Sequence, residues 1–176
     1  MPEIAAWREA FSRMGLKPTQ YRCASEALLR RYRKDGSLPE PRPLVDYLNF
    51  ASMAFGIPIA VLDRAGIPGG ITVRPAGGSE RCLTFRGAVE HPAAGEIIFA
   101  DPDGNAHSRR WTFRQSAPPA VSARTERALI VAEAHHASAG RDLADLEAEP
   151  QAGLKALGAQ VARSMMIGPS ERRLER

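Results

Sequence analysis

Apolar residues recur at helical spacing near both ends of the chain and at strand-like spacing in its middle. The first stripe consists of Ile4, Trp7, Phe11 and Met14. Intervals of three or four residues are typical of one face of an amphipathic helix, so we expect a helix over residues 2–14. The same reasoning predicts helices over residues 21–34 and 43–55, the second of which begins at Pro43 and stops at Gly56.

From residue 57 onward, short runs rich in β-branched and aromatic residues alternate with glycine, proline and aspartate. The runs that we expect to form strands are residues 57–63, 71–76, 81–85, 96–101, 109–115 and 128–134. Residues 101–104, Asp-Pro-Asp-Gly, are typical of a hairpin turn. A helical pattern returns over residues 141–166, where we expect Pro150 and Gly153 to interrupt it.

This order of elements predicts an α+β (α/β) fold, in which a mostly antiparallel β-sheet core is flanked by N-terminal and C-terminal helices. The chain has 176 residues, which is enough for one buried core and short for two. We therefore expect a single domain over residues 1–176. Its expected parts are N-terminal helices in residues 1–36, an α/β core in residues 42–135, and C-terminal helices with a polar tail in residues 139–176.

The composition is that of an ordinary globular protein, because 44% of the residues are hydrophobic and 25% are charged. No run approaches the roughly 20 apolar residues that cross a bilayer, and charges interrupt the N-terminal residues where a signal peptide would be apolar. We expect a cytoplasmic protein with no membrane partner. Cys23 and Cys82 stand far apart and in no CxxC pair, so we expect no disulfide, metal site or other cofactor.

Arginine dominates the positive charge of the chain. The net charge is +4, and the 24 basic residues include only three lysines, Lys17, Lys34 and Lys155. Guanidinium groups form forked hydrogen bonds with phosphate oxygens, which suits contact with an RNA backbone. The candidates lie in the second predicted helix: Arg22, Arg30, Arg31 and Arg33. A solvated helix face explains the same run without any partner.

The sequence lacks a phosphate-binding glycine loop, a zinc-protease motif and a serine nucleophile motif. Its most distinctive segment is residues 106–115, AHSRRWTFRQ. As one strand, this segment would place Arg109, Trp111, Phe113 and Gln115 on one face. Because buried polar groups need partners, such a face suits a pocket wall that meets an anion, a carboxylate or a stacked base. The alternative is an edge strand with solvated arginines over a buried tryptophan.

Three segments carry a resemblance to a known family. Residues 41–76 combine an apolar-Val-Asp helix that contains an asparagine, a Gly-x-Pro, an apolar strand that ends in Asp, and a strand with an arginine. Residues 95–116, GEIIFADPDGNAHSRRWTFRQS, and residues 128–134, ALIVAEA, follow in order. This arrangement over residues 20–135 resembles the tRNA-editing module of the β subunit of bacterial phenylalanyl-tRNA synthetase, and in particular a freestanding branch of that family.

The resemblance implies an editing-like α/β core in residues 42–135 and a function in translation quality control. The synthetase module hydrolyses tRNA that carries the wrong amino acid, because binding alone discriminates one methylene or hydroxyl by only about 1–3 kcal/mol. We expect a trans-acting aminoacyl-tRNA deacylase, which would be an ester hydrolase with tRNA as its partner. The expected protein is a monomer.

Residue by residue, the resemblance implies a changed pocket. Asn49 matches an asparagine of the editing pocket and is the candidate catalytic residue, which would orient water or the substrate amine. The neighbouring threonine of the synthetase is Leu48 here, and its histidine eleven residues after the asparagine is Ala60. We expect both positions to contact the substrate. These departures predict either a pocket for a different amino acid or binding without cleavage.

The late glycine-rich segment of the synthetase is replaced by residues 109–115. Arg109, Arg114 and Gln115 would contact terminal phosphates or a polar amino-acid side chain. Trp111 would form an apolar wall or stack on the terminal adenine. Two alternatives stay open: a tRNA- or RNA-binding protein without catalysis, and a hydrolase or sensor of a small amino-acid derivative.

Overall fold

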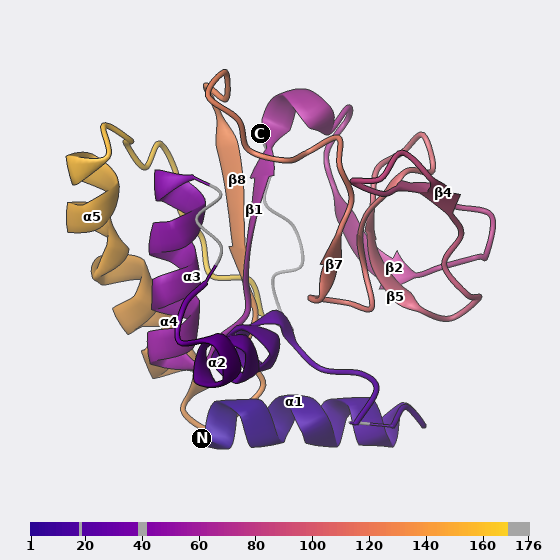
Figure 1. The fold of residues 1–176 in the computed structure, drawn as a ribbon, viewed down its shortest axis with the longest axis horizontal. Coiled ribbons are helices and arrows are strands. Elements are labelled where there is room, and N and C mark those ends of the chain that lie inside the picture. The colour runs from indigo at the N-terminus through magenta and orange to yellow at the C-terminus, as the bar shows by residue number, and fades with distance from the viewer. Residues whose placement is uncertain (18, 39–41, 169–176) are drawn as a thin grey trace.

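The computed structural model describes residues 1–17, 19–38 and 42–168 of the chain (Figure 1). Its helices are α1 (Pro2–Arg13), α2 (Ala24–Asp35), α3 (Pro43–Phe55), α4 (Ala139–Ala148) and α5 (Pro150–Ala156), with a 3-10 turn at Arg64–Gly66. The three N-terminal helices that periodicity predicted are confirmed to within a few residues. Gly36 and Gly56 end α2 and α3 in the left-handed conformation, with φ of 69° and 66°. None of the described helices combines the length and apolar character needed to cross a membrane.

The strands are β1 (Ile59–Asp63), β2 (Thr72–Pro75), β3 (Cys82–Leu83), β4 (Val89–Glu90), β5 (Ile97–Ala100), β6 (Ala106–Arg109), β7 (Arg114–Gln115) and β8 (Ala128–Ala132). They form an antiparallel ribbon β1–β8, an antiparallel sheet in the order β2-β5-β6-β7, and a hairpin β3–β4. The predicted turn at residues 101–104 connects β5 and β6. The fold is α+β with antiparallel sheets and flanking helices, as the element order predicted.

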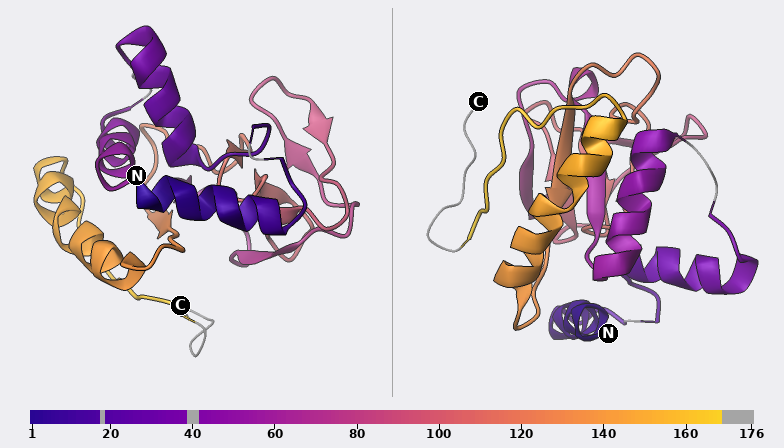
Figure 2. Two further views of the ribbon diagram at one scale, coloured as in Figure 1. Left: turned by 90° about the horizontal axis from the view of Figure 1, so that it is seen from below. Right: turned by 90° about the vertical axis from the view of Figure 1, so that its left-hand side faces the viewer.

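The β1–β8 ribbon lies between the helices and the four-stranded sheet. Figures 1 and 2 show α3, α4 and α5 on one side of the ribbon, and the larger sheet on the other. Successive residues of a strand point to opposite faces, so Ala60 and Leu62 of β1 share the face opposite to that of Val61. Leu62 is fully buried and packs with Phe99 of β5, which places this face of the ribbon against the sheet.

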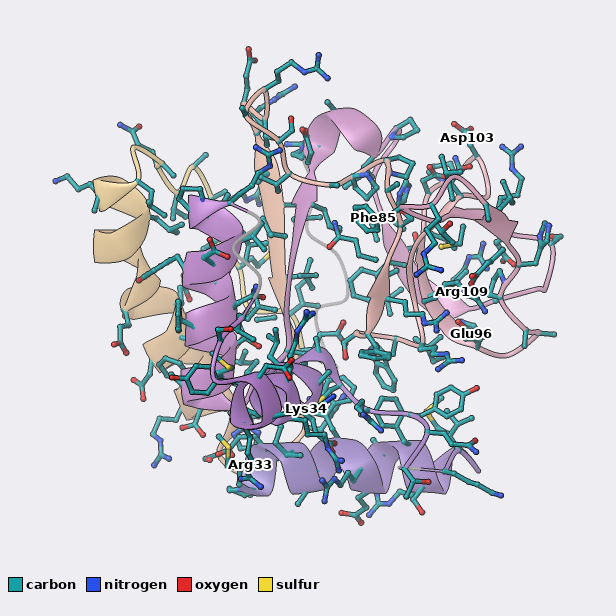
Figure 3. The ribbon with its side chains drawn as sticks, in the orientation of Figure 1. Arg33, Lys34, Phe85, Glu96, Asp103 and Arg109 are labelled. Carbon is teal, nitrogen blue, oxygen red and sulfur yellow. The ribbon has the colours of Figure 1, made fainter. Side chains whose placement is uncertain are left out.

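The prediction of one strand over residues 106–115 is wrong. The chain turns at Arg110 and Trp111, whose φ angles are +50° and +59°, and returns as β7. In the resulting hairpin Arg109 pairs with Arg114, whereas Gln115 pairs with Ser108. Arg109 and Gln115 therefore do not share the face that a single strand would give them. Figure 3 shows Arg109 next to Glu96, the residue that precedes β5.

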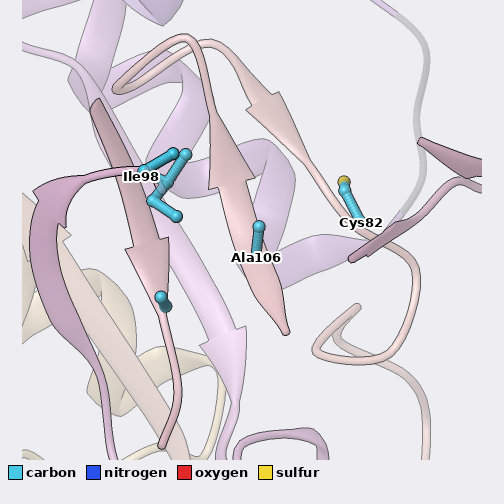
Figure 4. Packing of buried hydrophobic residues seen from close by; sticks show 5 residues of the cluster. Cys82, Ile98 and Ala106 are labelled. Atoms are coloured by element: carbon cyan, nitrogen blue, oxygen red, sulfur yellow. The ribbon is translucent and has the colours of Figure 1, made fainter. Parts of the chain in front are cut away.

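Three hydrophobic clusters fill the interior. The first lies between the four-stranded sheet and the β3–β4 hairpin and contains Cys82, Ile98 and Ala106 (Figure 4). The second joins α1 to the chain before α2 through Trp7, Phe11 and Cys23, and the third lies between the ribbon and the sheet. Trp111 contacts both the second and the third cluster. The Trp111 side chain thus connects the N-terminal helix α1 to the cluster between the β1–β8 ribbon and the four-stranded sheet.

The C-terminal helical region differs from its prediction. The break at Pro150 is confirmed, because α4 and α5 meet there. Gly153 does not interrupt a helix but lies within α5, where a side chain would collide with the ring of Tyr47 on α3. Residues 159–166 are not helical. The end of the polar tail, residues 169–176, lies outside the described residues, as do residues 39–41 before Pro43.

Gly153→Ala should loosen the packing of α5 on α3. A methyl group at this position overlaps the Tyr47 ring, and overpacking of this kind costs about 1–3 kcal/mol of unfolding free energy. Chemical denaturation measures the change, and limited proteolysis should show earlier cleavage in α5. Gly140→Ala in α4 is the matched control, since nothing lies within 4 Å of its added methyl group. Equal stability of the two variants would contradict this account.

Candidate active site

The residues that the resemblance singled out on α3 and β1 differ in their surroundings. Leu48 is buried, with 4% of its surface exposed, so it is part of the helix packing. Asn49 is partly exposed, and its amide forms no hydrogen bond to any other residue that the structure describes. Ala60 is partly buried and pairs with Val131, which packs in the cluster between ribbon and sheet. Ala60 therefore lies on the face of the ribbon that meets the sheet.

Trp111 is the residue around which this region is organised. Its ring meets Trp7 edge-on at a centroid distance of 5.0 Å and His135 at 5.2 Å. Its Nε1 donates a hydrogen bond of 2.7 Å to Oε2 of Glu133. Glu133 directly follows β8, and its backbone N–H bonds to the carbonyl of Pro58, which precedes β1. The indole thus lies against the end of the ribbon rather than on an exposed strand face.

The backbone at Arg110 and Trp111 is strained. Left-handed φ angles at residues other than glycine cost on the order of 1–3 kcal/mol each and persist only where the surroundings hold them. Here the Trp111 N–H donates to the Ile97 carbonyl at 2.8 Å, and the Arg110 N–H donates to Glu96 at 2.9 Å. The Arg110 guanidinium also lies 5.1 Å from the centre of the Tyr21 ring. Strain of this kind concentrates at functional sites, which makes this turn a candidate.

Glu133 is the acidic group of the site, and the sequence analysis missed it. Burial raises the pKa of its carboxyl group, and the single hydrogen bond from Trp111 only partly opposes that effect. Its Oε1 is buried and has no hydrogen-bond partner among the described residues. An incompletely paired carboxylate can accept a proton from water or bind an ammonium group. The signal in the sequence was one glutamate within the apolar run ALIVAEA.

The His135 ring lies beside the same tryptophan. Burial lowers the pKa of its imidazole, and the charge of His136 lowers it further. The His135 ring also meets Trp7, at a centroid distance of 4.3 Å. Glu133 and His135 therefore converge on Trp111 from the segment that follows β8. The carboxylate of Glu133, the imidazole of His135 and the indole rings of Trp7 and Trp111 therefore lie in one place.

Gln115 connects the sheet to the ribbon. Its amide Nε2 is 3.3 Å from the Val61 carbonyl and 3.4 Å from the Pro119 carbonyl. Both contacts use the amide as a donor along the edge of β1 that has no strand partner. The structure thus places Trp111, Gln115 and Ala60 where the ribbon meets the sheet.

Arg109 and Arg114 lie elsewhere, on the β3–β4 side of the sheet. Arg109 forms two hydrogen bonds of 3.1 Å with Glu96 and one of 2.6 Å with Glu90, and only 12% of its side chain is exposed. Burial alone would lower the pKa of Arg109, but the bonds and charge of Glu96 outweigh burial and raise it. Arg114 is half exposed and 3.6 Å from Glu90. The donors of Arg109 are thus engaged by carboxylates and do not face Trp111.

Comparison with models of protein families shows to which family the chain belongs. The family model of the B3/4 domain matches residues 6–145, most of the chain. The chain belongs to the B3/4 domain family. This is the domain type found in the editing region of the β subunit of phenylalanyl-tRNA synthetase, so the resemblance seen in the sequence is confirmed. No curated protein matches the chain.

The matched region of this B3/4 domain includes the basic helix α2, whose predicted RNA contacts fall into different environments. Arg30 pairs with Glu26 at 2.8 Å, and Arg31 lies 3.8 Å from Asp35. Arg22 donates to the Thr19 carbonyl. Arg33 has no ion-pair partner within the described parts of the chain. The four arginines therefore do not act as one uniform surface.

A possible metal-binding group of this B3/4 domain lies at the start of α4. Ligand atoms of Glu3, His136 and Asp142 lie within 4.8 Å of one another, the one such group within the described residues. Asp142 already accepts hydrogen bonds from His136 and Ser138, both at 2.8 Å. The bond from His136, followed by that from Ser138, lowers the pKa of Asp142 to about 2. These bonds explain the cluster as a connection between the end of the β8 segment and α4.

Arg109→Leu should destabilise the protein far more than Arg114→Leu. Removal of Arg109 leaves the buried Glu96 carboxylate without its main partner, which costs about 3 kcal/mol of unfolding free energy. Arg114 is half exposed, and loss of such a surface pair costs at most about 1 kcal/mol. Urea unfolding of both variants beside the parent protein measures the difference. Equal losses would show that the Arg109 network is not structural.

Proposed function

We propose that this B3/4 protein is a trans-acting deacylase that hydrolyses mischarged aminoacyl-tRNA. The observation that carries the proposal is Glu133, a carboxylate with one unpartnered oxygen beside a strained tryptophan turn, in a domain type found in a synthetase editing region. A buried carboxylate with a raised pKa is unfavourable for stability, and such groups cluster at functional sites. Membership of the family supports tRNA as the partner.

In the proposed reaction a water molecule attacks the carbonyl carbon that joins the amino acid to the ribose of the tRNA. Ionised Glu133 accepts the proton of that water and passes it to the leaving ribose oxygen as the ester C–O bond breaks. The products are a free amino acid and deacylated tRNA. Asn49 on α3 would orient the water or the substrate amine from the helix side of the ribbon. An aminoacyl ester is activated, so positioning and one weak base are sufficient chemistry.

The remaining groups of the site act on specificity in this proposal. Trp111 and His135 form the apolar and aromatic wall of the amino-acid pocket. Ala60 lies on the same face of the ribbon as Leu62, and its small side chain leaves room where the synthetase has a histidine. Gln115 can offer its amide oxygen to a polar substrate, since its two described contacts both use its N–H groups. In this proposal the pocket is adapted to an amino acid other than the one that the synthetase module removes.

A non-catalytic tRNA-binding protein is the second candidate. Ala60 favours it, because this position lacks the polar side chain that would help orient water. The two candidates differ in one measurable property, since a binding protein has no release of amino acid for mutations to remove. A hydrolase or sensor of a small amino-acid derivative would instead act without tRNA and without dependence on salt.

Hydrolysis should be selective for one mischarged tRNA in a panel of correctly and incorrectly charged tRNAs. We expect Glu133→Gln and Asn49→Ala to lower the rate of amino-acid release at least about 100-fold, the usual contribution of general base catalysis or substrate positioning. Release of radiolabelled amino acid measures the rate. Full activity of Glu133→Gln would remove Glu133 from the mechanism. Absence of release from every tRNA, with tRNA binding retained, would favour the binding protein.

Glu133→Gln should also make the protein more stable at neutral pH. Burial raises the pKa of Glu133 in the folded state above its ordinary value of 4.5, so the ionised carboxylate destabilises the fold progressively as the pH rises above that value. The amide keeps an acceptor for Trp111 and carries no charge. We expect a higher melting temperature at pH 8, roughly 2–4 °C for each kcal/mol relieved, and little difference below pH of about 4. Thermal denaturation of the variant and the parent at both pH values measures this difference in melting temperature. A lower melting temperature of the variant at pH 8 would contradict the view that the ionised carboxylate destabilises the fold.

A further inference from the structure

A groove of about 960 Å³ lies between α1 and α2, which cross steeply (Figure 2). Its walls combine residues of both helices: Met1, Ile4, Ala5, Arg8, Glu26, Leu29, Arg30, Tyr32 and Arg33. The site around Trp111 and Glu133 does not use this groove. Its lining combines apolar side chains with one tyrosine, one glutamate and three arginines.

The charges in the groove are arranged so that the positive ones face outward. Glu26 has 4% of its side chain exposed and is bound by Arg8 at 2.7 Å and by Arg30 at 2.8 Å. Burial would raise the pKa of Glu26, but the bonds from Arg8 and Arg30 outweigh burial and lower it, so Glu26 is ionised. Three guanidinium groups against one carboxylate leave an excess of two positive charges in the lining. The groove is therefore suited to an anion.

The arginines retain donors for such an anion. Arg8 and Arg30 are about half exposed, and Arg30 uses only its Nε in the bond to Glu26. Arg33 lies on the same wall with no ion-pair partner among the residues that the structure describes (Figure 3). Guanidinium groups with free N–H donors bind phosphate oxygens in a forked geometry.

Tyr32 adds a feature that simple charge attraction does not need. Its side chain lines the groove, yet 48% of the residue surface is exposed. An exposed aromatic ring beside a row of cations is the arrangement on which unpaired bases stack while their phosphates follow the positive charges. A duplex offers phosphates but keeps its bases stacked inside, so it cannot use the ring.

We propose that the groove between α1 and α2 binds a single-stranded segment of RNA, with a base stacked on Tyr32 and phosphates on Arg8, Arg30 and Arg33. The identity of this RNA rests on the proposed function, because a deacylase would meet the unpaired acceptor end of a tRNA. Ile4 supports this link, because it lines the groove and also belongs to the cluster that contains Trp7 and Trp111. α1 thus presents the groove on one face and packs against the candidate active site with the adjoining face.

The first test compares RNA forms by fluorescence anisotropy of the whole protein. A labelled single strand of about 12 nucleotides should bind about tenfold more tightly than a blunt duplex of the same sequence. The affinity for the single strand should fall with salt at a slope of about −2 in log–log form, as expected for three phosphate contacts. Equal affinity for strand and duplex, or preference for an acidic peptide over both, would overturn the proposal.

The second test separates stacking from charge. Tyr32→Ala should weaken single-strand binding at least about fivefold with the salt slope unchanged, whereas Tyr32→Phe should bind like the parent. Arg33→Ala should weaken binding and reduce the salt slope by about 0.7. Arg13→Ala is the matched control, because Arg13 lies on α1 with Glu9 as its partner and does not line the groove. Equal effects of Arg33→Ala and Arg13→Ala would show that net charge, and not the groove, binds RNA.

The outcomes distinguish the groove from the proposed function. RNA binding requires no hydrolysis, so Glu133→Gln should retain parent affinity for the labelled strand. Absence of deacylation together with Tyr32-dependent binding would refute the enzyme and support the groove. Deacylation with the same KM for tRNA in Tyr32→Ala and in the parent would support the enzyme and refute the groove. Circular dichroism of each variant confirms that the fold is retained.

Discussion

The contact of the Trp111 indole with two hydrophobic clusters is the interaction on which the arrangement of the structure depends. On one side the ring packs with Trp7 and Phe11 of α1, and on the other it meets Leu62 and Phe99 between the ribbon and the sheet. Large aromatic rings contribute most of the buried area in such junctions. The N-terminal helix, the ribbon and the sheet therefore share one side chain. Its position is fixed by a turn whose backbone is unfavourable in isolation.

That strain and the partly paired Glu133 belong together. The left-handed turn at Arg110 and Trp111 aims the indole N–H at a carboxylate that burial destabilises. Neither feature improves stability. Bonds to Glu96 and Ile97 hold the turn, and Glu133 is held by the indole N–H and by the Pro58 carbonyl. Proteins keep such local costs where a function requires them. Asn49 lies on α3, on the helix side of the ribbon, and its amide has no hydrogen-bond partner among the described residues.

Periodicity alone predicted the helices and most of the strands, because each reflects spacing between neighbours along the chain. It failed at residues 106–115, where neither Arg110 nor Trp111 is a residue that normally marks a left-handed turn. It also placed Arg109 in a binding site, whereas Glu90 and Glu96 occupy its donors in the fold. The resemblance proposed Asn49 and Ala60 as site residues by their position, but it did not point to Glu133.

By itself the sequence determined the fold class, the order of elements and the family, since these depend on local periodicity and on short motifs in a fixed order. Only the tertiary structure decided which of the described polar groups are paired and which are not. Glu26 and Arg109 look like surface charges in the sequence. In the fold Glu26 is bound by Arg8, which lies 18 residues away, and Arg109 is bound by Glu90 and Glu96, which lie 19 and 13 residues away. Arg33 and Glu133 look no different in the sequence, yet within the described residues Arg33 has no ion-pair partner and one oxygen of Glu133 has no hydrogen-bond partner. Pairing depends on distances between segments that are remote in the chain, and no local pattern encodes those distances.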